Sequence, residues 1–338
     1  FGFDSFTSEE YMHDVEYNPL EWAKDSVLTG EILKALRSTE GRDLVFTVSV
    51  QPHGKYPTEP LEGAETIAVS GMEDEARRCG FEYYLGQLHQ TDAFLKKLTT
   101  ALNHYNEPTV VVFYGDHLPS LQITQDELSR GTVQTTEYVI WSNFGLKKQD
   151  QDIQAYQISA LLFERLGIHE GTIFNYHQKF MDGGESDEQY QADLTLLEYD
   201  LLYGSRYCVY SADAPEPAQM RLGVEDITVS RLDYAAETQT LAVTGENFTP
   251  FSVILKKGEQ VPTEYISRNQ LCAPELEAAE GDTFCVAQIS ATDSMRILSQ
   301  TGELVFSDFL TLPIKSGKVF EIAGQRRTFE APGRRMEE

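Results

Sequence analysis

The hydrophobic pattern changes once along the chain, after Gly204, and this change limits the possible folds more than any other feature. Before it, apolar runs typical of strands alternate with segments of helical periodicity, as in a mixed α/β domain. After it, short β-rich runs follow one another with turn residues between them, as in a small β-sandwich. Residues 212–217, Ala-Asp-Ala-Pro-Glu-Pro, have the composition of a linker between two such parts.

The first part therefore predicts strands and helices in alternation. We expect strands over 44–50, 109–114 and 138–141, and helices over 20–37, 73–103 and 158–166. The run 109–114 is uniformly apolar rather than alternating, so we expect it in a parallel sheet that is covered on both faces. In the second part we expect short strands at 227–229, 240–243, 252–255, 284–287 and 304–306.

Charge and apolar content count against several functions. The 27 basic and 54 acidic side chains give a net charge of −27, which repels nucleic-acid phosphates and anionic lipid surfaces. No apolar run approaches the roughly 20 residues of a membrane-spanning helix. The chain starts at Phe1 without an initiator Met or a signal peptide, so we expect a processed or truncated product whose membrane anchor lies upstream.

The four cysteines, Cys79, Cys208, Cys272 and Cys285, show no CxxC spacing, which counts against a thiolate zinc site. Cys272 and Cys285 lie in a strand-rich stretch, where they can face each other across neighbouring strands. The alternative is that all four are buried thiols.

The sharpest local feature is Tyr-Gly-Asp-His-Leu-Pro at 114–119, directly after the apolar run 109–114. In open α/β sheets, functional groups gather where strands end at their carboxyl edge. Asp116 and His117 offer one oxygen and one nitrogen ligand side by side, which suits Mn²⁺ or Zn²⁺ better than Ca²⁺ or an all-oxygen Mg²⁺ site. The alternative is a turn with a surface histidine.

A second polar loop follows the run 44–50 and reads Gln-Pro-His-Gly-Lys-Tyr-Pro at 51–57. Its histidine, His53, lies beside a glycine that permits the close approach of a ligand. A neutral imidazole can donate to a phosphoryl oxygen, and a protonated one can act as a general acid. A lone loop histidine is often without function, but two such loops at the ends of two predicted strands favour a shared site.

Five stretches resemble one family in order along the chain. They are Phe-Gly-Phe-Asp-Ser-Phe at 1–6, Phe-Thr-Val-Ser-Val-Gln-Pro-His-Gly at 46–54, Val-Val-Phe-Tyr-Gly-Asp-His-Leu-Pro-Ser-Leu at 111–121, Glu-Tyr-Val-Ile-Trp-Ser-Asn-Phe at 137–144 and Leu-Glu-Tyr-Asp-Leu-Leu-Tyr-Gly at 197–204. The chain resembles the later part of the catalytic domain of lipoteichoic acid synthases and related phosphoglycerol transferases, in the sulfatase branch of the alkaline phosphatase superfamily. The resemblance implies a three-layer α/β domain, incomplete at its N-terminus, that is followed by the all-β sandwich.

The resemblance also implies residue roles. Asp116 and His117 match the pair that binds the catalytic metal, usually Mn²⁺, with Mg²⁺ or Zn²⁺ as alternatives. His53 matches the histidine that contacts the phosphoglycerol group, although the family more often has Asn where this chain has Pro52. The threonine nucleophile and an acidic metal ligand of the family would lie upstream of Phe1, so we expect this chain alone to be inactive.

The function implied is transfer of glycerol phosphate from phosphatidylglycerol to a glycolipid or polyglycerolphosphate acceptor. It would take place at the extracellular face of a bacterial cell membrane, in a parent protein anchored there. The alternatives are a sulfatase or a phosphoethanolamine transferase of the same superfamily, or a non-catalytic binding module at the cell surface. No nucleic-acid partner is expected.

The β-rich part has a separate likeness. Leu-Ala-Val-Thr-Gly-Glu-Asn-Phe at 241–248, followed by Ser-Val-Ile-Leu at 252–255, resembles the start of an immunoglobulin-like module of the IPT/TIG type. The predicted organisation is a sulfatase-like domain over 1–211, a linker over 212–222, the immunoglobulin-like sandwich over 223–315 and a solvated tail over 316–338.

Overall fold

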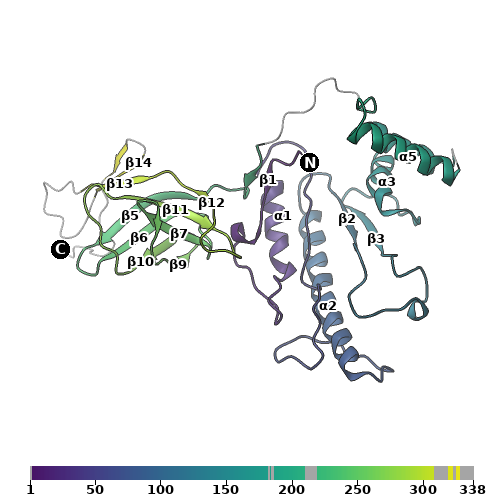
Figure 1. Cartoon of the computed structure of the whole chain (residues 1–338), viewed down its shortest axis with the longest axis horizontal. Coiled ribbons are helices and arrows are strands. Elements are labelled where there is room, and N and C mark those ends of the chain that lie inside the picture. Colours follow the sequence, from purple (N-terminus) through teal and green to yellow (C-terminus); the bar gives the residue numbers. More distant parts are fainter. Residues whose placement is uncertain are drawn as a thin grey trace. The chain divides into compact units, whose positions relative to one another are not determined.

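The computed structural model describes residues 2–181, 183, 186–209, 219–307, 319–322 and 325–327, and Figure 1 shows their elements. The chain divides into two units, one with residues 1–94 and 218–338 and the other with residues 95–217. The predicted domain bounds stay a prediction, and the predicted linker at 212–217 lies outside the described residues. No helix in the described part of the chain has the length and apolar character to cross a membrane.

The β-rich part of the first unit has two sheets, as the sequence predicts. One sheet has the order β5 (Thr228–Ala235), β6 (Thr240–Glu246), β10 (Gln270–Ala273) and β9 (Glu264–Ser267). The other has the order β15 (Gln325–Arg327), β14 (Val319–Ile322), β13 (Leu304–Ser307), β11 (Thr283–Ile289), β7 (Ser252–Lys256) and β8 (Glu259–Gln260), with β12 (Ile297–Gln300) paired to β11. All these pairings are antiparallel, and each of the five predicted short strands is confirmed.

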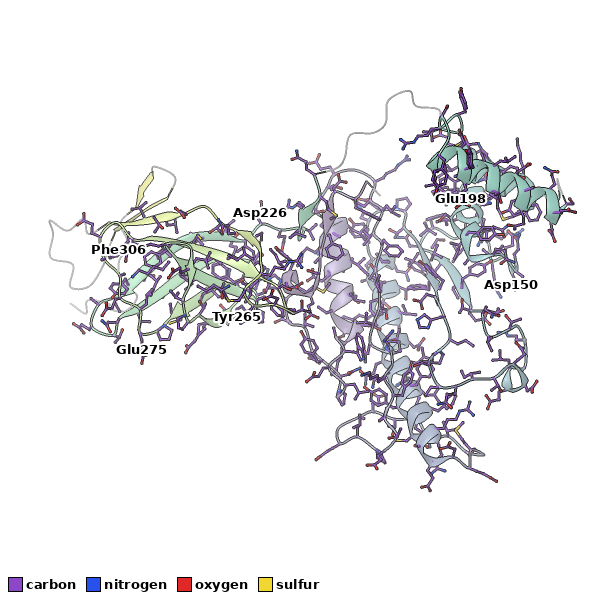
Figure 2. All side chains as sticks on the ribbon, in the orientation of Figure 1. Asp150, Glu198, Asp226, Tyr265, Glu275 and Phe306 are labelled. Carbon is purple, nitrogen blue, oxygen red and sulfur yellow. The ribbon has the colours of Figure 1, made fainter. Side chains whose placement is uncertain are left out.

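One core joins the two sheets into a sandwich. Its buried side chains come from both sheets, among them Leu241 and Leu271 from one and Ile254 and Phe306 from the other. Phe306, labelled in Figure 2, packs edge-on against Tyr234 of the facing sheet, with ring centroids 5.9 Å apart. Burial of such alternating apolar positions is the main source of stability in a sandwich.

Residues 319–322 and 325–327, which we expected in a solvated tail, form β14 and β15 and extend the sheet beyond β13. The short strand β4 (Arg221–Leu222) lies at the end of the segment 212–222, whose role as a linker stays a prediction.

All four cysteines of the chain are free, so Cys272 and Cys285 are not bonded to each other. The alternative of four buried thiols is wrong, since only Cys285 is buried and the other three are partly exposed.

The mixed α/β part contains the predicted helices, with one different start. α1 (Leu28–Leu36) follows a 3₁₀ turn at Asp25–Val27, so the predicted helix over 20–37 begins too early. The reason is the side chain of Asn18, whose Oδ1 accepts hydrogen bonds from the amides of Leu20 and Trp22 and holds a non-helical turn there. The remaining helices are α2 (Glu75–Asn103), α3 (Ile158–Arg165), α4 (Thr172–Met181) and α5 (Asp187–Leu202).

Two of the three strands predicted for this part are present, and the third is absent. β2 (Val110–Tyr114) and β3 (Tyr138–Ser142) form as predicted, but they pair antiparallel in a two-stranded sheet rather than in the expected parallel sheet. Residues 44–50 do not form a strand, because no strand in the described part of the chain lies in register beside them. Leu44, Phe46 and Val48 are accordingly exposed, at 81%, 63% and 65%.

The start of the chain packs against the sandwich, an arrangement that the sequence did not predict. β1 (Ser5–Phe6) pairs parallel with β4, and a 3₁₀ turn follows at Glu9–Tyr11. The Tyr11 hydroxyl lies 2.7 Å from Ser299 Oγ, and the Glu10 carboxylate accepts a hydrogen bond from the Ala291 amide at 3.0 Å. Gln288 of β11 is central to this contact, since its side chain amide donates to the carbonyl oxygen of Glu10 and to Thr249 Oγ1.

We predict that Gln288→Ala releases the start of the chain from the sandwich. Gln288 is 1% exposed and also accepts from Ser252 Oγ at 2.8 Å, so its loss leaves several buried polar groups unpaired. The free energy of unfolding should fall by about 1–3 kcal/mol, and amide hydrogen exchange at residues 5–12 should accelerate. The exposed Gln300 of β12 provides the control, since Gln300→Ala should change neither quantity. Unchanged exchange at residues 5–12 in a destabilised Gln288→Ala protein would contradict this role.

Candidate functional site

The turn that follows β2 carries Asp116 and His117. Its backbone is joined to the segment before β3, because the Gly115 amide donates to the Glu137 carbonyl at 3.2 Å and Thr136 Oγ1 donates to the Gly115 carbonyl at 2.6 Å. β2 itself is anchored by Asn143, whose side chain accepts from the Thr109 amide and donates to the carbonyls of Leu102 and Glu107. These hydrogen bonds therefore fix the position of the turn relative to β2 and β3.

The two side chains of this turn face each other. His117 Nε2 lies 3.6 Å from Asp116 Oδ1, and the two side chains are 61% and 81% exposed. His117 Nδ1 lies 2.8 Å from the Leu118 carbonyl oxygen. A carbonyl only accepts, so Nδ1 carries the hydrogen and a neutral ring has its lone pair on Nε2. Metal-binding histidines in proteins are commonly oriented in this way.

The geometry of this pair fits part of a metal site. Two ligand atoms that each lie about 2.1 Å from one ion are roughly 3–4 Å apart, and the observed separation is 3.6 Å. A carboxylate oxygen with an imidazole nitrogen is also a suitable donor set for Mn²⁺ or Zn²⁺. The residues that the structure describes contain no group of three or more such donors, so a complete site needs ligands in addition to Asp116 and His117.

His53, the third predicted site residue, lies in the first unit, whereas Asp116 and His117 lie in the second. Its ring packs against the indole of Trp22, with centroids 4.9 Å apart and planes inclined by 60°. A turn positions it, since the His53 amide donates to the Val50 carbonyl at 3.0 Å. Trp22 could not be predicted as a neighbour of His53, because it is 31 positions earlier in the chain and belongs to no motif that we identified.

The loop after His53 is attached to its neighbours by specific contacts. The Tyr56 hydroxyl donates to the Pro52 carbonyl at 2.9 Å, and burial raises the pKa of Tyr56 to about 12, which keeps this donor protonated. Further along, the Glu65 carboxylate binds His89 and Gln90 of α2, each at 2.8 Å. The loop also runs close to α2 at Gly86, where an added Cβ atom would lie 2.0 Å from the Glu65 carbonyl oxygen.

We predict that Gly86→Ala detaches this part of the loop from α2. The new methyl group must displace the backbone at Glu65, and such overpacking costs about 1–3 kcal/mol. Amide hydrogen exchange should accelerate at Ile67 and Val69, whose amides bond to Glu82. Gly30 of α1 is the matched control, because its Cβ would meet nothing within 4 Å and Gly30→Ala should be neutral or stabilising. Equal effects of the two substitutions would contradict the close approach.

The family described as Sulfatase matches residues 1–168, a range that includes His53, Asp116 and His117.

Two relatives from Rhizobium meliloti (strain 1021) share part of the sequence. A "Putative cyclic beta-1,2-glucan modification protein" is 26% identical over 245 residues, which are 61% of this chain and 38% of that protein. The "Capsular polysaccharide biosynthesis protein RkpI" is 32% identical over 129 residues, which are 37% of this chain and 21% of that protein. The chain thus spans well under half the length of either relative.

Among solved structures, the chain is similar to the Streptococcus pyogenes phosphoglycerol transferase GacH in complex with sn-glycerol-1-phosphate. The identity is 22% and the TM-score 0.47, over 55% of this chain and 50% of that chain.

The observed elements form a mixed α/β part and a β-sandwich, and the mixed α/β part includes residues 1–168, which are similar to the Sulfatase family.

Proposed function

We propose that this chain is part of a metal-dependent phosphoglycerol transferase of the lipoteichoic acid synthase type. The observation that carries the proposal is the pair Asp116 and His117, with Nδ1 bonded to a carbonyl and Nε2 facing the carboxylate at 3.6 Å, within a sulfatase-family domain. The resemblance carried by the ordered motifs at 46–54, 111–121 and 137–144 supports phosphoglycerol as the transferred group, and sulfate is the alternative.

Each of the three candidate site residues has a proposed role. Asp116 Oδ1 and His117 Nε2 would hold Mn²⁺, and the Leu118 carbonyl would keep the imidazole in the required orientation. When bound, the ion withdraws charge from a phosphoryl oxygen and favours the alkoxide of the nucleophile. His53 contacts the phosphate of the substrate and donates a hydrogen bond that strengthens as negative charge develops.

The reaction would have two displacements. A threonine oxygen of the parent protein would attack the phosphorus of phosphatidylglycerol, and diacylglycerol would leave with the proton that threonine loses. The hydroxyl of an acceptor would then attack the phosphorus, and its proton would return to the threonine. The site would lie at the extracellular face of the cell membrane, in a protein anchored there.

The acceptor that we favour is a carbohydrate hydroxyl. The names of the two Rhizobium relatives concern a glucan and a capsular polysaccharide, and these support a glycan or glycolipid acceptor over a polyglycerolphosphate chain. We also propose that the sandwich is an immunoglobulin-like module of the IPT/TIG type. It would then be attached to the domain that performs the transfer.

The substrate class can be tested with the complete protein that contains this chain. Supplied with Mn²⁺ and vesicles, it should release diacylglycerol from phosphatidylglycerol and not from phosphatidylethanolamine. Hydrolysis of an aryl sulfate without turnover of phosphatidylglycerol would instead indicate a sulfatase. Absence of any turnover, together with retained binding of a glycan, would indicate the non-catalytic binding module.

Substitutions in the same protein should separate the metal-binding residues from the phosphate-binding one. Asp116→Asn and His117→Gln should lower both the bound Mn²⁺ and the activity. His53→Gln should lower activity by about 100-fold and leave the metal content unchanged, because its partner is the phosphate. Metal analysis beside the kinetics checks both statements.

His104 provides the control for the histidine substitutions. It is exposed and its ring Nδ1 lies 2.8 Å from the Thr100 carbonyl oxygen of α2, so His104→Gln should change neither quantity. Loss of metal in the His53→Gln protein would make His53 a metal ligand and overturn its assignment.

A further inference from the structure

We propose that the buried carboxylate of Asp25 positions His53, which makes Asp25 a positioning residue of the site. The structural part of this proposal stands on contacts within the first unit. Its kinetic consequence rests on the proposed function, in which His53 contacts the substrate phosphate.

Asp25 is bonded directly to the segment that ends at His53. Its carboxylate accepts from Ser49 Oγ at 2.7 Å and from the Gln51 amide at 3.4 Å. In return, the Asp25 amide donates to the side chain oxygen of Gln51 at 2.9 Å. Both residues are 1% exposed. Residues 49–51 are therefore held at two points, and His53 follows only two positions later.

The helix α2 also forms hydrogen bonds with Asp25 and Gln51. Thr91 Oγ1 donates to the Asp25 carboxylate at 2.7 Å. The side chain amide of Gln51 donates to Gln87 Oε1 at 3.1 Å and to Gln90 Oε1 at 2.6 Å. The segment before His53 is thus connected to α2 through two side chains, although it does not belong to any sheet.

The same network also determines where the ring beside His53 lies. Asn18 donates to the Gln51 carbonyl at 3.1 Å and to Gln87 Oε1 at 3.2 Å. With its oxygen it accepts from the Trp22 amide at 3.0 Å, and the Trp22 indole packs on the His53 ring. One set of buried hydrogen bonds therefore places both the backbone that carries His53 and the surface against which its ring packs.

Burial of the Asp25 carboxylate costs free energy, so a gain in stability does not by itself explain this network. A carboxylate at 1% exposure loses nearly all its hydration, and each of its three donors here, Ser49, Gln51 and Thr91, is uncharged. Such a network specifies one arrangement of its members more than it adds to stability. The arrangement that it specifies is the position of residues 49–53 relative to Trp22.

The direct test uses nuclear magnetic resonance on the 338-residue chain. The carbon-bound protons of the His53 ring, identified by comparison with His53→Gln, should show a ring-current shift from Trp22 that Trp22→Leu removes. Asp25→Asn should move the same signals toward the values of an unstructured histidine. If Asp25→Asn does not fold, Ser49→Ala and Thr91→Val each remove one of its hydrogen bonds and should give smaller shifts in the same direction.

Asp282 of the sandwich is the matched control. It is a buried aspartate at 2% exposure, paired with Lys256 at 3.0 Å and Lys257 at 2.7 Å, and it belongs to the same unit. Asp282→Asn should lower the melting temperature without moving the His53 signals. Unchanged His53 signals in a folded Asp25→Asn chain, or equal movement in Asp282→Asn, would overturn the positioning role.

The kinetic test is a double-mutant cycle in the complete protein. Asp25→Asn should lower turnover by about 10- to 100-fold, as expected when a group that orients a functional side chain is lost. In a His53→Gln background, the same substitution should change turnover by less than about twofold, because the two residues act together. Full additivity would refute the coupling. Failure of the unmodified protein to use phosphatidylglycerol would refute the proposed function, while the spectroscopic result would still decide the role of Asp25.

Discussion

The mutual hydrogen bonding of Asp25 and Gln51 is the constraint on which the mixed part of the first unit depends. Residues 44–50 have no strand partner among the described residues, so ladder hydrogen bonds do not hold them in place. Side chain bonds replace that ladder: Asp25 and Gln51 hold each other, and both connect to α2. Where a sheet would supply many equivalent bonds, this segment relies on a few that are buried and specific.

The candidate site shows which kind of side chain a sequence pattern can single out. Asp116 and His117 stand out because adjacent ligand-type residues after an apolar run form a local pattern, and their role as metal ligands stays a prediction. Their facing geometry and the bond from His117 Nδ1 to Leu118 follow from the same short turn. Asp25, Asn18 and Trp22 were not predictable, since each contacts residues 24 or more positions away and none has a spacing that marks it.

The fold was predictable to the same extent and for the same reason. α2 and the strands of the sandwich follow from periodicity and turn residues, which are properties of neighbouring positions. Strand pairing depends instead on which distant backbone segment is available. This is true of the pairing of β2 with β3, of the pairing of β1 with β4 and of the absence of a strand at 44–50. Apolar content alone does not determine the partner of a strand, and this explains why the expected parallel sheet was wrong.

The contact between the start of the chain and the sandwich also has a consequence for biosynthesis. The Glu10 carbonyl and its donor Gln288 are separated by 278 positions, and the second unit lies between them in the sequence. At the usual rate of about 5–20 residues per second, a ribosome needs on the order of ten seconds or more to supply that donor. During this interval residues 95–217 emerge in full, while the segment at 5–11 has neither β4 nor β11 to pair with. The first unit is therefore completed only after the second has been synthesised, and until then residues 5–11 are without the strands that they contact in the folded chain.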